Sequence, residues 1–187
     1  LKSGWFLVGA EVEAFEDKFA RYVEAKHCIG VANGLDSLIL SLRACGIAPG
    51  DEIIVPSNTF VATWLAASAV SAIPIPVEPN AATHNIEASL IEKAITDRTR
   101  AILPVHLYGQ PVDLDPILEI ARKYSLRVIE DAAQAHGARS KGQRIGAHAD
   151  AVCWSVYPAR NLGAMGDGGA VTTDNPDLAE RIRILGN

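Results

Sequence analysis

The sequence predicts an α/β protein built on a mostly parallel sheet of about seven strands, with helices covering both faces. Two observations carry this prediction. Short apolar, β-rich runs recur along the chain, and helix-like segments separate the first five of them. Such alternation is typical of right-handed βαβ units. Few of the runs alternate polar and apolar residues, as expected of strands buried on both faces.

The runs and the segments between them give an approximate map of the elements. The expected strands cover residues 28–32, 52–56, 73–77, 101–106, 127–131, 151–155 and 169–173. The helices between the first five strands are expected near 35–45, 60–71, 87–95 and 114–124. At 187 residues the chain fits one domain with a real hydrophobic core.

Two further helices are expected outside this series. At the amino end, residues 11–25 place four apolar side chains on one helical face at spacings of three and four: Val12, Phe15, Phe19 and Tyr22. After the last strand, another helix carries three apolar side chains that need a surface to pack on: Leu178, Ile182 and Leu185.

Composition excludes several classes of protein. The net charge of −5 gives no electrostatic reason to expect nucleic acid or an anionic membrane surface as partner. Three prolines interrupt the uncharged stretch from Ile53 to Val77, which therefore fits strand, helix and strand better than a membrane span. Cys28, Cys45 and Cys153 form no CxxC pair, so neither a disulfide framework nor a metal site is expected. We expect a cytoplasmic protein.

Ligands of such sheets bind beyond the carboxyl ends of the strands. After the first strand, "NGLDSL" (33–38) turns directly into a helix. Gly34 permits close backbone approach, Asp36 or Ser37 can cap the helix, and the free N–H groups of its first turn suit a phosphate. The same features also suit a plain turn, which is the more common interpretation of this motif taken alone.

The next strand ends offer aromatic and polar candidates. Phe60, in "PSNTF", could stack on a planar ring or join the core, and Asn58 or Thr59 could cap the helix that follows. His106 and Tyr108, in "HLYGQ", could serve a site, although a histidine at a strand end is more often structural.

Two later strand ends carry charged residues. In "IEDAAQAHGA", Asp131, Gln134 and His136 could share one mouth, or Asp131 could simply cap the following turn. In "SVYPARNLG", Ser155 can present its hydroxyl to a phosphate, while Arg160 is the only charge before Asp167. Pro158 and Gly163 shape a bend in the same loop.

Taken together, six ordered segments resemble the DegT/DnrJ/EryC1/StrS family of sugar aminotransferases, fold-type-I enzymes that use pyridoxal phosphate (PLP). The segments are "SGWFLVGAEVEAFEDKFARY", "VANGLDSL", "GDEIIVPSNTFVATW", "AILPVHLYGQPVDLDPI", "VIEDAAQAHGA" and "GDGGAVTT", and they span nearly the whole chain. The sequences of "HLYGQ" and "PSNTFVATW" are most similar to those of the branch that acts on nucleotide-linked 3-keto deoxysugars.

The resemblance implies a role for each candidate in the cofactor site. Backbone groups of the turn at Gly34, Leu35 and Asp36 would receive the PLP phosphate, together with the Ser155 hydroxyl. Phe60 would stack on the pyridine ring. The carboxylate that pairs with the ring nitrogen would be Asp131, and the residue beside the ring's 3-hydroxyl would be Gln134.

Arg160 departs from the family pattern. The resemblance places it where the family carries the lysine that binds the cofactor covalently. A guanidinium keeps its proton and is a poor nucleophile and base. Lys141 is the nearest other lysine in sequence, but nothing in the sequence places it at the cofactor. Transamination by the family's usual route is therefore expected to fail in this chain.

Members of the family are about twice as long, with a small carboxyl-terminal domain and a dimer partner that completes the phosphate pocket. The resemblance therefore implies that residues 1–187 are a PLP-binding large domain, apparently incomplete, of a homodimer. At family level it implies amino transfer from L-glutamate to a keto sugar nucleotide. The alternative is a silent homologue that holds PLP or pyridoxamine phosphate without a covalent bond, or a structural partner subunit.

A third interpretation is an NAD-dependent sugar-nucleotide enzyme, which has the same rhythm of strands and helices. Such an enzyme needs a G-x-G-x-x-G turn after the first strand. The turn "VANGLDSL" lacks that pattern, and "GAMGDGGA" comes late in the chain and precedes a strand. The sequence therefore disfavours this class.

Overall fold

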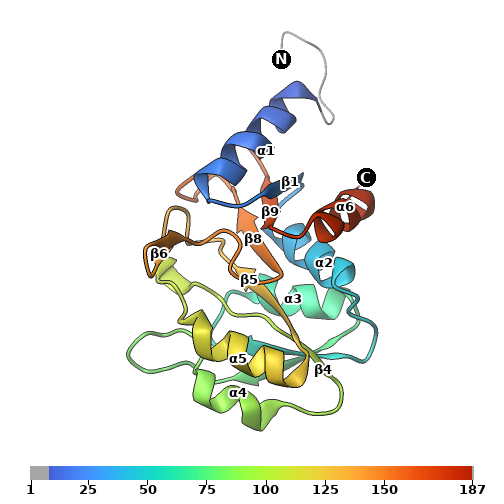
Figure 1. Ribbon diagram of the computed structural model, residues 1–187, viewed down its shortest axis with the longest axis vertical. Helices are drawn as coiled ribbons and strands as arrows, with labels where there is room; N and C mark the ends of the chain where they lie inside the picture. Colours follow the sequence, from blue (N-terminus) through green and yellow to red (C-terminus); the bar gives the residue numbers. More distant parts are fainter. Residues whose placement is uncertain (1–8, 187) are drawn as a thin grey trace.

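The computed structural model describes residues 9–186, and these form a seven-stranded sheet between helices (Figure 1). "SGWFLV" (3–8), the start of the first family-like segment, lies outside the described residues. The strands are β1 (His27–Val31), β2 (Glu52–Pro56), β3 (Ile73–Val77), β4 (Thr99–Ile102), β5 (Arg127–Asp131), β8 (Ala151–Ser155) and β9 (Gly169–Thr173). A small hairpin adds β6 (Arg139–Ser140) and β7 (Gln143–Arg144).

The helices lie close to their predicted places. They are α1 (Ala10–Tyr22), α2 (Gly34–Ala44), α3 (Val61–Ala69), α4 (Ala88–Ala94), α5 (Leu114–Tyr124) and α6 (Pro176–Leu185), with a short 3₁₀ turn, η1, at Leu107–Gly109. The strand order in the sheet is β1-β9-β8-β5-β4-β2-β3. Only β9 runs against its neighbours, so the sheet is mostly parallel as predicted.

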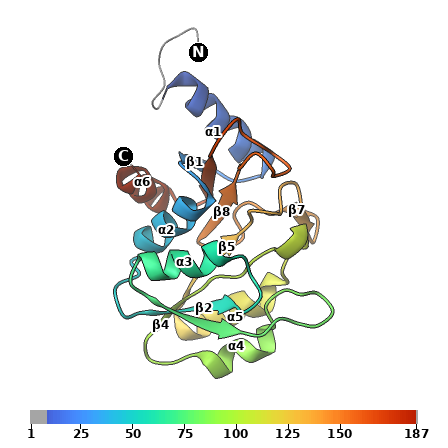
Figure 2. The same cartoon turned by 180° about the vertical axis from the view of Figure 1, so that it is seen from behind.

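Helices cover both faces of the sheet because successive side chains of a strand point to opposite sides. In β2, Ile53 and Val55 pack with residues of α2 and α3, whereas Ile54 packs with residues of α4 and α5. The views from front and back show these two helix pairs on opposite sides (Figures 1 and 2). All of β2 is buried, which explains its uninterrupted apolar sequence.

The fourth strand differs from its prediction. It runs from Thr99 to Ile102 rather than over 101–106. Pro104 has no N–H to donate, so it interrupts the ladder. Beyond it, Val105 forms only an isolated bridge with Asp131. The chain then leaves the sheet at its carboxyl edge, beside the end of β5.

The outer helices are also less buried than predicted. Helix α1 ends at Tyr22, and Glu24 just after it has a left-handed backbone with φ 64°. Phe19 is buried, but Tyr22 is exposed and lies under the Arg144 guanidinium. In α6, Leu178 and Ile182 are buried and Leu185 is exposed, correcting the predicted three-residue apolar face.

The long uncharged stretch is β2, α3 and β3, as predicted. Within residues 9–186, none of the helices has both the length and the apolar character that crossing a membrane requires.

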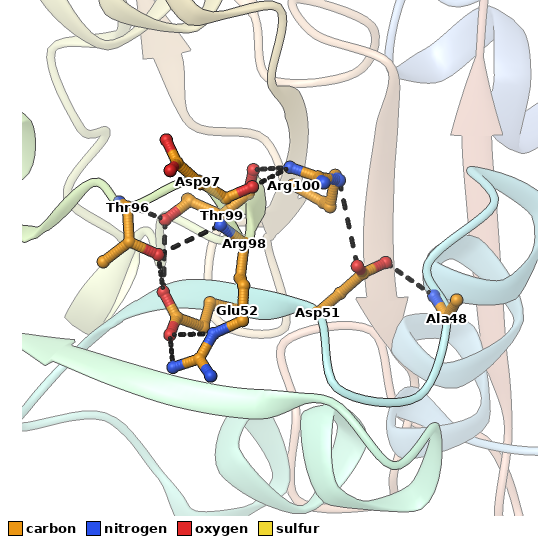
Figure 3. Close-up of polar contacts among 8 residues, drawn as sticks. All are labelled: Ala48, Asp51, Glu52, Thr96, Asp97, Arg98, Thr99 and Arg100. Atoms are coloured by element: carbon orange, nitrogen blue, oxygen red, sulfur yellow. Dashed lines mark hydrogen bonds and ion pairs between the residues drawn. The ribbon is translucent and has the colours of Figure 1, made fainter.

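Polar contacts hold the amino-terminal end of β2 (Figure 3). Glu52 is only 2% exposed, and its carboxylate accepts hydrogen bonds from the Arg98 guanidinium at 2.6 and 3.0 Å and from the Thr96 hydroxyl at 2.5 Å. These bonds, led by the one from Thr96, hold the pKa of Glu52 below its usual value. The network ties β2 to the segment that enters β4, at the edge away from the strand ends that carry the candidate residues.

Candidate functional site

A cavity of about 660 Å³ lies at the carboxyl ends of β5 and β8, beside the start of α2 and α3. Five segments that are far apart in sequence form its wall, as expected for a doubly covered sheet. The structure brings together these predicted residues: Gly34, Leu35, Phe60, Asp131, Gln134, Ser155 and Arg160. The side chain of Asp36 lies outside the lining.

The start of α2 is pressed against the end of β8. A Cβ built on Gly34 would lie 2.6 Å from the Ser155 Cβ, so only glycine fits. The helix cap is Asn33, which accepts the Asp36 N–H at 2.8 Å, and the predicted caps Asp36 and Ser37 are wrong. The close approach sets the first N–H groups of α2 beside the Ser155 hydroxyl, an arrangement that suits an anion.

Asp131 is a buried carboxylate at the floor of the cavity. Its two oxygens accept hydrogen bonds from the Thr63 hydroxyl at 3.0 Å and from the Ala133 N–H at 3.1 Å. Asp131 therefore both caps its turn and lines the cavity, so the two predicted roles coexist. Burial raises the pKa of Asp131, although these two hydrogen bonds oppose the shift. A cationic ring nitrogen next to the carboxylate would favour its charged form.

Phe60 has 67% of its surface exposed, which excludes the predicted core role and leaves its ring beside the cavity. It is the capping residue of α3, but its side chain makes no cap hydrogen bond. The prediction that Asn58 or Thr59 caps α3 is wrong. The Thr59 hydroxyl pairs with that of Thr63, and the Asn58 amide donates to the backbone oxygen of His84.

Both histidines of the candidate segments lie outside the cavity lining. His106 is fully buried: its Nδ1 accepts the Val112 N–H at 3.0 Å, so its Nε2 donates to Glu130 at 2.9 Å. His106 is therefore a structural histidine at a strand end, one of its two predicted roles. His136 packs against the Trp154 ring, and burial lowers the pKa of His136 to about 4. The prediction that His136 shares the mouth of the site is wrong.

Arg160 lines the cavity, and its Nε atom is buried without a hydrogen-bond partner among the described residues. The backbone N–H of Arg160 donates to the backbone oxygen of Tyr157 at 2.8 Å and closes a turn. Gly163 is needed in the same loop, because a Cβ there would lie 2.5 Å from the Pro158 oxygen. The loop therefore presents the guanidinium to the cavity, while the equivalence of Arg160 to the family's lysine stays a prediction.

No lysine lines the cavity in the part of the chain that the structure describes. Lys141, the candidate nearest in sequence, binds the carboxylates of Asp113 and Asp115 on the hairpin side of the molecule. None of the described residues supplies a lysine amine at the site.

Sequence reasoning missed two residues that shape the site: Asn33, which caps α2, and Thr63, which donates to Asp131. It named Tyr108 as a candidate but not its contact, in which the Tyr108 backbone N–H donates to the side-chain oxygen of Gln134 at 2.7 Å. Thr63 could have been found, because it lies in the first turn of α3, three residues after the capping residue Phe60. The other two contacts depend on loop geometry that no periodic pattern reveals.

The sequence matches the DegT/DnrJ/EryC1/StrS aminotransferase family over residues 1–187. The chain belongs to this family. It is 58% identical over its whole length to the erythromycin biosynthesis sensory transduction protein EryC1 of Saccharopolyspora erythraea, covering 51% of that protein. It is 56% identical over its whole length to the dTDP-3-amino-3,4,6-trideoxy-α-D-glucose transaminase of Streptomyces venezuelae, covering 49% of it.

The fold is that of the family's solved structures. The S. venezuelae DesV crystal structure, in complex with a ketimine intermediate, superimposes with a TM-score of 0.97 at 55% identity, covering all of this chain and 50% of DesV. The chain thus spans about half the length of the relatives it matches. Other similar solved structures include one with the cofactor PMP bound and one described as a PLP form.

Most of the cavity fits PLP. The Gly34–Ser155 contact provides a cradle for its phosphate, Asp131 can pair with its ring nitrogen, and Phe60 can cover its ring. Bound PLP supplies an electron sink for chemistry at an attached amine. The fit fails at one point, because Arg160 stands in the cavity and no described lysine does.

Proposed function

We propose that this chain is the cofactor-binding large domain of a nucleotide-sugar aminotransferase-like protein, and that it holds PLP or pyridoxamine phosphate without a covalent bond. The single observation behind this proposal is the cavity itself. It has a phosphate cradle and a buried carboxylate, but it is lined by Arg160 and by no described lysine. A guanidinium keeps its proton at neutral pH, and so it can neither attack an aldehyde nor accept a proton there.

The second candidate function is the family's own: PLP-dependent amino transfer from L-glutamate to a nucleotide-linked keto sugar in deoxy-amino-sugar biosynthesis. Identities of 56–58% to its relatives support this candidate. So do Gly34, Asp131 and Ser155, which give the cavity the groups the cofactor needs. Transamination would then require an amine that the described residues do not supply.

Binding and reversibility test the proposal. Titration of the protein with PLP, followed by dialysis, should show saturable binding that is lost on dialysis. Ser155→Ala should weaken this binding roughly tenfold, since one hydrogen bond to a charged phosphate is removed. Ser140→Ala, in the β6–β7 hairpin, is the matched control and should bind as the unmodified chain does. Absence of PLP binding, or binding that survives denaturation, would contradict noncovalent retention.

We also propose that the protein works as a cytoplasmic homodimer. Four apolar side chains at the cavity mouth are about half exposed or more: Phe60, Val61, Leu65 and Tyr157. Such a patch is typical of an interface between subunits. The three cysteines are free, as a reducing compartment requires.

A further inference from the structure

The side-chain amide oxygen of Gln134 already accepts a hydrogen bond. It accepts the Tyr108 N–H at 2.7 Å, while the residue itself lines the cavity. A glutamine amide has one acceptor oxygen and one nitrogen with two N–H donors. With the oxygen held by Tyr108, the N–H groups are the part of the amide left to address a ligand.

The group that holds Gln134 lies in an unusual turn. Tyr108 has φ 57° and Gly109 has φ 80°, both in the left-handed region. A tyrosine adopts that region at a cost that neighbouring contacts must offset. Gly109 also touches the same partner, since a Cβ there would lie 2.9 Å from the Gln134 backbone oxygen.

The buried side-chain amide of Asn85 holds this turn in place. Asn85 is only 4% exposed, accepts the Leu107 N–H at 3.1 Å and donates to the Gln110 oxygen at 3.1 Å. Both ends of the turn are therefore tied to one side chain. Because the turn cannot easily shift, the direction of the Tyr108 N–H is fixed as well.

From these contacts we propose that the Tyr108–Gly109 turn is a positioning element for the Gln134 side chain. It holds the side-chain oxygen of Gln134 so that the amide N–H groups face the cavity, toward the ring oxygen beside which the family resemblance places Gln134. The inference rests on the proposed function, because the ring it concerns is that of the PLP-type cofactor. Neither Tyr108 nor Gly109 touches the ring in this scheme; they act through Gln134.

The test compares two ligands, PLP and its 3-deoxy analogue, which lacks the ring oxygen. The unmodified protein should bind PLP roughly tenfold or more tightly than the analogue, as expected for a hydrogen bond to a charged oxygen. Gln134→Glu keeps an acceptor for the Tyr108 N–H but has no donor, so it should lose this preference. Hydrogen exchange of the Tyr108 amide should stay slow in that variant and become fast in Gln134→Ala.

Gly109→Ala tests the turn itself, and it should reduce the preference for PLP to within about threefold, since the turn must move away from Gln134. Gly142→Ala is the matched control: Gly142 also has a positive φ, of 87°, but a Cβ there would meet nothing within 4 Å. It should keep the full preference.

The outcomes separate the two proposals. If Gly109→Ala retains the preference, or weakens both ligands equally, the turn is structural and the inference is wrong. Retention of the preference in Gln134→Glu would also overturn it. If Gly109→Ala does not fold, the ligand preference of Gln134→Glu and the hydrogen-exchange rate of the Tyr108 amide still test the inference. Equal binding of both ligands by the unmodified chain refutes the inference alone, whereas binding of neither refutes the proposed function with it.

Discussion

At the scale of single residues, the contact between Gly34 and Ser155 sets the shape of the anion end of the cavity. Gly34→Ala would force a Cβ to 2.6 Å from the Ser155 Cβ, so α2 must move away from β8. We expect a loss of about 1–3 kcal/mol in the free energy of unfolding, as for overpacking, and PLP binding weakened roughly tenfold. Denaturant titration and ligand titration measure the two effects.

The control for this prediction is Gly166→Ala in the same long loop as Arg160, where a Cβ would meet nothing within 4 Å. It should leave both measurements unchanged. Equal behaviour of the two alanine variants would show that the close approach does not shape the site.

Asp131 illustrates a conflict between stability and binding. Burial raises its pKa, so the folded chain binds this proton more tightly than the unfolded chain does. Ionisation of Asp131 therefore costs stability as pH rises from the unfolded pKa, near ~4, towards the higher folded value. Asp131→Asn stays neutral, and its amide can still meet Thr63 and Ala133.

Without ligand, Asp131→Asn should have a Tm at pH 7 equal to or above that of the unmodified protein. This advantage should vanish below about pH 4, where Asp131 of the unmodified protein is protonated in both the folded and the unfolded state. PLP binding should fall at least roughly tenfold, because the pairing with the ring nitrogen is lost. Thermal melts at several pH values check the sign, and a clearly lower Tm at pH 7 would refute it.

At the scale of elements, the Glu52 network joins the start of β2 to the segment that enters β4 (Figure 3). Glu52→Gln removes charge from a buried carboxylate that accepts bonds from Arg98 and Thr96. We expect a loss of about 1–3 kcal/mol in the free energy of unfolding at pH 7, measured by urea titration. Because the pKa of Glu52 is lowered, this contribution is present above its unfolded pKa and is lost as pH falls through the folded pKa.

Glu92→Gln is the matched control, since its ion pair with Lys123 is exposed and joins α4 to α5 on the surface. Its unfolding midpoint should stay close to that of the unmodified protein. If both variants lose the same stability, the buried network has no special role.

Elements with strong local signals were predictable, and those that depend on long-range contacts were not. Strands β2, β3, β5, β8 and β9 begin and end at their predicted residues, because apolar runs bounded by turns mark them. Pro104 cut β4 short, although its missing N–H was visible in the sequence. Leu185 and Tyr22 continue an apolar periodicity past the point where their helices meet the sheet.

The site shows the same division. Its strand-end residues were predicted because parallel strands deliver their carboxyl ends to one edge. The roles of Asn33 and Tyr108 were not, because each depends on which neighbour a backbone N–H meets in three dimensions. The prediction for His136 was wrong because its ring packs on Trp154 and does not line the cavity.

At the scale of the whole molecule, the apolar mouth of the cavity predicts self-association. Val61→Lys with Leu65→Lys places two charges on successive turns of α3, both on exposed positions. Sedimentation should show a dimer for the unmodified protein and a monomer for this double variant, because charges oppose burial of the patch. Ile184→Lys, exposed on α6, is the control and should remain dimeric. A monomeric unmodified protein would contradict the proposed homodimer.

The central claim is that a PLP site of this family persists here without its covalent anchor. The most direct measurement is the intact mass of the protein after incubation with PLP, reduction with borohydride and denaturation. The unmodified chain should carry no cofactor on a lysine of its site, whereas Arg160→Lys should gain one cofactor, mapped by peptide analysis to position 160. A reduced adduct on a native lysine at the cavity, or no adduct in Arg160→Lys despite PLP binding, would contradict the account.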